Sequence, residues 1–135
     1  MSITGKINHI AMAVPSIEGF LEKHSVFYSR LERGPLIVNE TQGVKEMFVS
    51  DGNHVLELLE PLREGSPLDG FLKKAPFGGL IHIAYDVEDI ATAIAEVERA
   101  GGRKISGPVP DVAFDGRDIA FVFLGGQVIE LIQLP

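Results

Sequence analysis

The sequence repeats itself at a spacing of 73 residues, and this internal repeat constrains the fold more than any other feature. The segment NHIAMAV at 8–14 aligns with IHIAYDV at 81–87, and VLELLEP at 55–61 aligns with VIELIQL at 128–134. The alignment needs no insertion or deletion. Short solenoid units recur every few tens of residues, so this repeat is too long to be one. We therefore interpret the chain as a duplicated domain in which neither copy closes a core alone.

Each copy predicts the order strand, helix and three strands, βαβββ. Alternating residues mark the strands, residues at helical spacing mark the helices, and Gly or Pro separates them. The first copy predicts a strand over 6–14, a helix capped by Ser16 that runs to Gly34-Pro35, and strands near 36–40, 44–50 and 54–60. The second copy predicts a strand over 80–87, a helix between its N-cap Asp89 and Gly101-Gly102, strands near 103–106, 117–124 and 127–133, and a loop over 106–118.

A short helix is expected between the two copies. Ser66 suits an N-cap and Pro67 suits a first helical turn, so the helix is predicted to run through Lys74. We predict one α+β domain over 1–135, consisting of a module at 1–61, a linker with this helix at 62–78 and a second module at 79–135.

Four side chains recur at the repeat spacing: each copy offers one histidine and, 48 residues later, one glutamate. They are His9, Glu57, His82 and Glu130. Strand alternation places each glutamate on a face with aliphatic neighbours, where a buried charge is costly unless it is paired or liganded. A single histidine or glutamate in a strand is more often structural or solvent-facing. The matched offsets and faces of the four favour a shared metal ion.

The kind of metal follows from the ligand types. The chain has no cysteine, so any ion must be held by nitrogen and oxygen. Imidazole with carboxylate suits Zn, Ni, Co, Mn or Fe(II), and four such ligands leave two octahedral positions open. His24 and His54 have no partner in the repeat, and we predict surface or rim positions for both.

Charge and hydropathy exclude several classes of protein. The net charge is −7 and Lys and Arg are scattered singly, which disfavours a nucleic-acid partner. No apolar run is long enough to span a bilayer, and the N-terminal residues lack the pattern of a signal peptide. We expect a soluble, cytoplasmic protein.

These residues resemble the vicinal oxygen chelate superfamily (glyoxalase, bleomycin resistance and dioxygenase), and within it the methylmalonyl-CoA epimerases. The resemblance covers nearly the whole chain. It implies paired βαβββ modules that form a cupped mixed sheet around a metal. The segments that carry it are HIAMAVPSIEGFLEKH, ETQGVKEMFV, VLELLEPLREGSPLDGFLKK, IHIAYDVEDI and VIELIQLP.

The resemblance implies a set of site residues and a chemistry. His9, Glu57, His82 and Glu130 match the metal ligands of the superfamily, with a divalent Co, Ni, Zn or Mn ion expected. Glu130 and Glu46 are the expected acid/base residues for moving a proton alpha to a thioester carbonyl, Glu130 before Glu46. A surface position beside Lys45 is the alternative for Glu46. The expected substrate is an acyl-CoA thioester, and the expected assembly is a homodimer.

Two other functions stay open at this point. The same four ligands match a glyoxalase I-type lactoylglutathione lyase, and some relatives are metal-free drug-binding proteins. Three segments depart from the epimerase pattern: Ile81 replaces a histidine, FLGG at 123–126 replaces a His-Pro-Lys element, and the loop over 107–118 differs. Arg117 in that loop is a candidate contact for a substrate anion or a surface residue.

Overall fold

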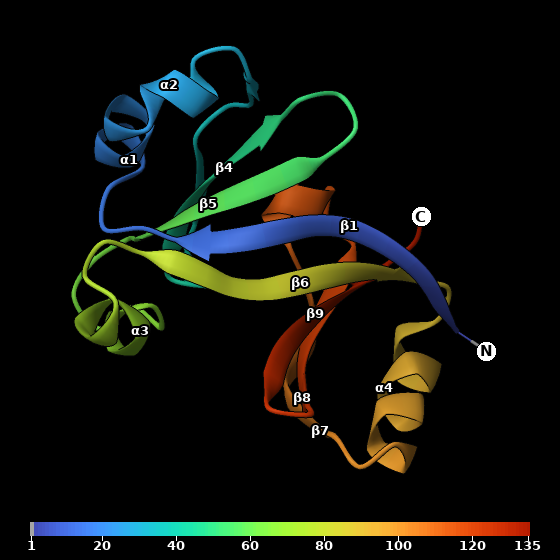
Figure 1. Cartoon of the computed structure of the whole chain (residues 1–135). Coiled ribbons are helices and arrows are strands. Elements are labelled where there is room, and N and C mark those ends of the chain that lie inside the picture. The colour runs from blue at the N-terminus through green and yellow to red at the C-terminus, as the bar shows by residue number, and fades with distance from the viewer. Residues whose placement is uncertain (1) are drawn as a thin grey trace. The chain divides into compact units, whose positions relative to one another are not determined.

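The computed structural model describes residues 2–135 and divides into two compact units. One contains the described residues up to Ile10 together with His82–Pro135, and the other is Ala11–Ile81. Two strands cross the division, β1 (Ile3–Ala13) and β6 (Gly79–Val87) (Figure 1). The units therefore do not follow the two copies of the repeat, because the first strand of the chain begins in the unit that holds the second copy.

The Ala11–Ile81 unit packs α1 on one face of a small antiparallel sheet and residues of α3 on part of the other. Strand β4 lies between β2 and β5, and β3 also pairs with β4. Its elements are α1 (Ile17–Lys23), α2 (Ser25–Tyr28), β2 (Glu32–Arg33), β3 (Ile37–Asn39), β4 (Val44–Ser50), β5 (Val55–Pro61) and α3 (Asp69–Lys74).

Alternation on β4 and β5 gives this sheet two different faces. Met47, Val49 and Leu58 point toward α1, where they form a core with its apolar residues. Residues of the opposite parity point the other way, so Glu46 and Glu57 share the face that α1 does not cover.

The other unit repeats this design around a longer helix. Its strands lie in the order β1-β6-β9-β8-β7, with β6 parallel to β9 and β8 antiparallel to both its neighbours. Val87, Val122 and Leu131 pack under α4, leaving residues of the opposite parity for the other face. The remaining elements are α4 (Ile90–Arg99), β7 (Arg103–Pro110), a 3₁₀ turn (Val112–Phe114), β8 (Asp118–Leu124) and β9 (Gln127–Gln133).

The α+β class and most strands are confirmed, but three predicted boundaries are wrong. The first helix ends at Lys23, because His24 leaves helical geometry (φ −103°, ψ 23°) and the chain restarts as the short α2. The helix after Ser66 begins two residues later than predicted, with Leu68 as its N-cap. The loop predicted over 106–118 is strand as far as Pro110, because β8 supplies pairing partners across two register shifts.

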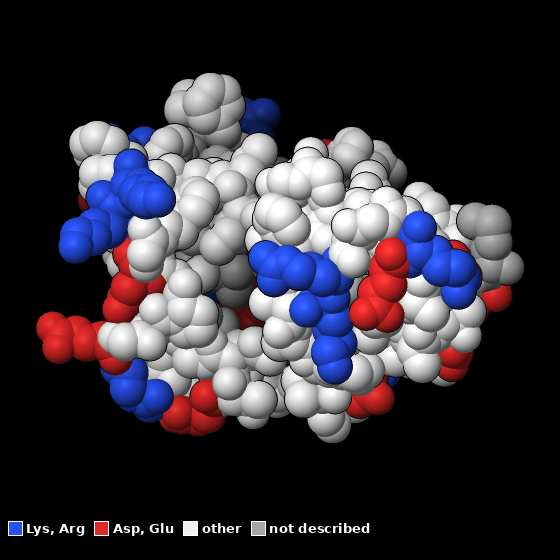
Figure 2. All heavy atoms as spheres, turned by 90° about the horizontal axis from the view of Figure 1, so that it is seen from below, with Lys and Arg blue, Asp and Glu red and all other residues white. Residues whose placement is uncertain are grey.

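Surface charge follows the sequence prediction of scattered single charges. Lys and Arg are interspersed with Asp and Glu on the face seen in Figure 2. Within residues 2–135, no helix is long and apolar enough to cross a membrane.

The N-cap of α4 gives a pH-dependent contribution to stability. The Asp89 carboxylate accepts hydrogen bonds from the hydroxyl and backbone N–H of Thr92, at 2.5 and 2.9 Å, and these lower its pKa. A lowered folded pKa stabilises the protein above the unfolded value of about 3.9, and this stability is lost as pH falls through the folded pKa.

We therefore expect Asp89→Asn to lower the melting temperature at pH 7, and the difference from wild type to vanish at acid pH. Thermal melts between pH 7 and pH 2.5 measure it. Ser16 caps α1 at the equivalent place in the repeat, through an uncharged bond from Gly19 N. Ser16→Ala is the control, with a loss that does not change with pH. A constant Asp89→Asn difference would contradict the assignment.

Candidate metal centre

Three of the four predicted ligands meet in the unit that contains His82–Pro135. His9 comes from β1, His82 from β6 and Glu130 from β9. The strand register explains part of this meeting, since Glu130 lies opposite Ala84 and His82 is two residues earlier on the same face. Both histidines direct Nε2 at one oxygen, Glu130 Oε1, at 3.2 Å for His9 and 3.1 Å for His82.

His9, His82 and Glu130 lie in a buried environment that contains an ionised carboxylate. All three are at least nine-tenths buried. Burial alone raises the pKa of Glu130, but hydrogen bonds from His82 and His9 outweigh it and hold the pKa below its usual range. The Glu130 carboxylate therefore stays ionised near neutral pH. Each short nitrogen–oxygen contact needs a positive charge between two lone pairs, which is either a proton or a metal ion.

Aromatic rings pack against both imidazoles. The Phe114 ring stacks on His9 with centroids 5.7 Å apart, and the Phe121 ring meets His82 edge-on at 5.3 Å. Arg117 anchors this segment, because its guanidinium donates to the backbone oxygens of Phe114 and Gln133 at 3.2 Å each. Arg117 is thus half-buried and bound to main chain, a role that the sequence analysis missed.

The other two predicted site residues lie in the Ala11–Ile81 unit. Glu57 on β5 and Glu46 on β4 are each 3% exposed, so the alternative of a surface position for Glu46 is wrong. Glu46 lies opposite Leu59, which makes Glu57 its diagonal neighbour on the same face. Such diagonal pairs are about 7–8 Å apart.

Asn39 holds Glu46 in place, and no sequence signal pointed to it. Its Nδ2 donates to Glu46 Oε1 at 2.9 Å, while its Oδ1 accepts from the backbone N–H of Gln42 at 3.1 Å. The second bond fixes which way the amide faces, so the first is a directed hydrogen bond to a buried carboxylate.

The chemistry of the donor set fits a divalent cation. The candidate ligand atoms of His9, His82 and Glu130 lie within 4.8 Å of one another, close enough to surround one ion. Imidazole nitrogen and carboxylate oxygen are ligands of first-row transition metals. A His/Glu cluster that could hold a metal ion is therefore present, as the repeat predicted.

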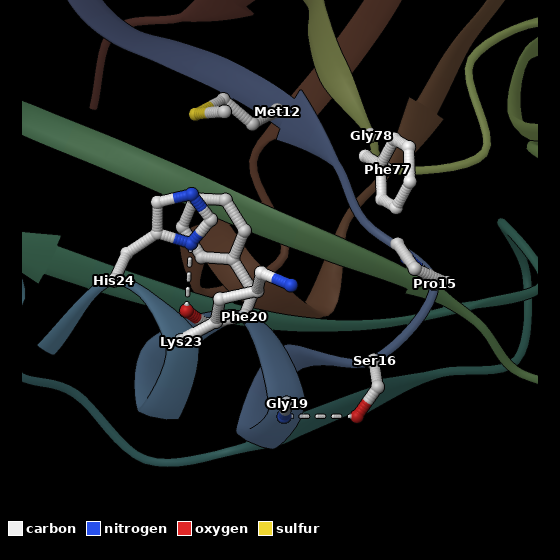
Figure 3. A pocket seen from close by; sticks show the side chains of 9 residues that line it. All are labelled: Met12, Pro15, Ser16, Gly19, Phe20, Lys23, His24, Phe77 and Gly78. Carbon is white, nitrogen blue, oxygen red and sulfur yellow. Dashed lines mark hydrogen bonds between the residues drawn. The ribbon is translucent and has the colours of Figure 1, made fainter.

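The remaining two histidines lie elsewhere. The imidazole of His54 is exposed, as predicted, and pairs with Asp51 at 3.0 Å. His24 is half-buried, where its ring stacks on Phe20 and its Nδ1 donates to Phe20 O at 3.0 Å. It borders a hollow of about 590 Å³ beside α1 that also exposes Lys23 and Phe77 (Figure 3). No acidic residue lines this hollow, so it is not the metal site.

Comparison with known proteins identifies relatives of this chain. The chain is 36% identical to the ethylmalonyl-CoA/methylmalonyl-CoA epimerase of Cereibacter sphaeroides, over 96% of this chain and 98% of that one. It is also 36% identical to the mitochondrial methylmalonyl-CoA epimerase of Homo sapiens, over 96% of this chain and 74% of the relative. These names favour an epimerase over a glyoxalase I-type lyase.

A solved structure and a family model extend the comparison. Streptomyces coelicolor methylmalonyl-CoA epimerase, in complex with 2-nitronate-propionyl-CoA, superposes with a TM-score of 0.80 and 30% identity, covering 98% of each chain. The family model matches residues 8–121, which include His9, Glu57 and His82. The chain is therefore a member of the glyoxalase/bleomycin resistance protein/dioxygenase superfamily, and the relatives compared here are epimerases.

Proposed function

We propose that this protein is a metal-dependent epimerase that inverts the alpha carbon of a 2-substituted malonyl-CoA thioester. The observation that carries the proposal is the buried cluster of His9, His82 and Glu130, in a chain 36% identical to an ethylmalonyl-CoA/methylmalonyl-CoA epimerase. A solved relative holds an acyl-CoA analogue, which supports a thioester substrate. The homodimer stays a prediction from the resemblance, and the cytoplasmic location stays a prediction from the sequence pattern.

Glu57 is the proposed fourth ligand of the metal. It occupies the position in the first copy that Glu130 occupies in the second, and it is a buried carboxylate on the face of β5 that also carries Leu59. Two carboxylates would balance the charge of a divalent ion held with two neutral imidazoles. We expect Co, Ni, Zn or Mn, because imidazole and carboxylate accept all four.

Epimerisation requires a proton to leave one face of the alpha carbon and another to arrive on the opposite face. A divalent ion held by these residues would supply a Lewis acid for the negative charge that develops on the thioester oxygen. The protein supplies the proton-transfer groups, for which we propose Glu46 and Glu130. The aromatic rings of Phe114 and Phe121 keep the imidazoles dry, which strengthens electrostatic interactions at the site.

The environments of Glu46 and Glu130 suggest different shares of this work. Two imidazoles converge on Glu130 and lower its pKa, which suits a ligand and weakens a base. Glu46 accepts from a neutral amide, Asn39, and is not among the clustered ligands. We therefore place the larger share of proton transfer on Glu46, reversing the order expected from the resemblance.

Metal binding is the first expected outcome. Titration of the metal-free protein with Co²⁺, followed by visible absorption, gives the dissociation constant. His9→Ala and Glu57→Ala should each weaken binding by at least the roughly 10- to 100-fold that loss of a supporting residue costs. His54→Ala is the control and should bind as wild type, because its imidazole is 82% exposed. Unchanged binding by His9→Ala would contradict the site, and unchanged binding by Glu57→Ala would remove only the fourth ligand.

Proton exchange is the second expected outcome. In D₂O, the Co²⁺-loaded protein should incorporate one deuterium at the alpha carbon of methylmalonyl-CoA faster than the uncatalysed rate, as read by mass spectrometry. Chelation of the metal should abolish the acceleration. No acceleration with methylmalonyl-CoA or ethylmalonyl-CoA would overturn the proposal. Turnover of a methylglyoxal–glutathione thiohemiacetal instead would favour the glyoxalase I-type lyase.

Loss of turnover in Glu46→Gln is the third expected outcome. Glutamine keeps an acceptor for Asn39 but cannot take up a proton, so we expect kcat to fall about 10²- to 10⁴-fold with Co²⁺ affinity unchanged. Glu40→Gln is the matched control, because Glu40 is exposed and pairs with Arg63. A wild-type kcat for Glu46→Gln would show that Glu46 does not transfer the proton.

A further inference from the structure

Asn8 connects a buried carboxylate to one of the clustered histidines. Its Nδ2 donates to Asp86 Oδ1 at 2.9 Å, and its Oδ1 lies 2.8 Å from His9 Nδ1. Asp86 is 5% exposed and comes from β6, while Asn8 and His9 are successive residues of β1. All three belong to the same compact unit.

The donor and acceptor groups of Asp86, Asn8 and His9 allow only one arrangement of protons along the two hydrogen bonds that join them. A carboxylate only accepts, so the NH₂ group of Asn8 must face Asp86 and its carbonyl oxygen must face His9. A carbonyl oxygen also only accepts, so His9 must carry its proton on Nδ1. With Nδ1 protonated, Nε2 is the nitrogen that a metal ion can bind, and it is also the nitrogen that lies 3.2 Å from Glu130 Oε1.

The repeat does not account for this contact. At the repeat spacing, Asn8 corresponds to Ile81 and Asp86 corresponds to Ala13, neither of which has a polar side chain. The Asn8–Asp86 pair is therefore not part of the repeated sequence pattern. Its contact with His9 Nδ1 points to a task at this histidine rather than to the architecture that the two copies share.

We propose that Asn8, oriented by Asp86, is a positioning residue that selects the Nδ1-protonated tautomer of His9 and aims its Nε2 lone pair at the metal. This inference rests on the metal centre of the proposed function. Loss of Asn8 removes this acceptor from Nδ1, while the Glu130 carboxylate beside Nε2 favours the tautomer in which Nε2 carries the hydrogen and cannot bind a metal. Hydrogen-bonded supports of this kind set the tautomer and orientation of metal-binding histidines.

Substitution of Asn8 tests the effect on metal affinity. Asn8→Ala should raise the Co²⁺ dissociation constant of the otherwise intact protein about 10- to 100-fold. Asn53→Ala, at an exposed asparagine in the turn before β5, is the control and should bind as wild type. Wild-type affinity in folded Asn8→Ala would overturn the inference, while deuterium exchange by the wild-type enzyme would leave the proposed function standing.

Exchanging the residues at positions 8 and 86 distinguishes a positioning role from simple loss of structure. In the double variant Asn8→Asp with Asp86→Asn, the new carboxylate accepts from His9 Nδ1 and from the new amide. His9 Nδ1 therefore again faces an oriented acceptor. We expect its Co²⁺ affinity to return to within a few-fold of wild type. Asp86→Asn alone should bind more weakly, because an amide at 86 no longer fixes the orientation of Asn8. If Asn8→Ala does not fold, the comparison of Asp86→Asn with the double variant tests the inference instead. Equal Co²⁺ affinities for these two variants would overturn it.

The tautomer can be read by ¹⁵N NMR without a measurement of activity. In the Zn²⁺-loaded protein, His9 should carry its proton on Nδ1 and bind the ion through Nε2. Asn8→Ala should weaken or shift this Nδ1–H signal, and the double variant should restore it. A His9 that carries its proton on Nε2 in the Zn²⁺-loaded wild type would contradict the proposal directly.

Discussion

Burial of the Glu130 carboxylate between two imidazoles is the interaction on which the rest of this structure depends. A charge removed from water is costly unless opposite charge or hydrogen bonds compensate it. His9 and His82 supply that compensation at 3.2 and 3.1 Å, from two strands far apart in the sequence. The sheet that carries all three must therefore place β1, β6 and β9 together.

In each unit the face of the strands under α1 or α4 is apolar, and in the Ala11–Ile81 unit the opposite face also holds the apolar residues Val44 and Leu59 beside the buried acids. Helix α4 covers Val122 and Leu131, and α1 covers Met47 and Leu58, so the core of each unit is complete on the helix side. The opposite faces can then carry buried acids. Glu130 is stabilised by imidazoles, whereas Glu46 accepts from an amide, and this difference in partner is the basis for the different roles proposed for the two carboxylates.

Specific function arises where the two copies differ. Glu46 corresponds to Ile119, and Asn8 corresponds to Ile81, so the proposed base and the proposed positioning residue each occur once. On the proposed function, duplication supplies the matched ligand set, and residues present in one copy only supply the proton-transfer and positioning groups. The hollow beside α1, which the four predicted ligands do not line, is separate from this chemistry.

Local periodicity was sufficient to predict the α+β class, the strands and the matched faces of Glu57 and Glu130, because alternation and repeat spacing are properties of the chain itself. It could not predict that the first helix stops at Lys23, where the backbone of His24 leaves helical geometry, or that residues to Pro110 join β7, where β8 supplies the pairing partners. Nor could it find Asn8, Asp86 or Asn39, whose importance lies in single hydrogen bonds. Sequence determined which residue types could serve a metal; only tertiary structure decided which atoms face one another, because hydrogen bonds depend on distance and direction that no spacing along a chain encodes.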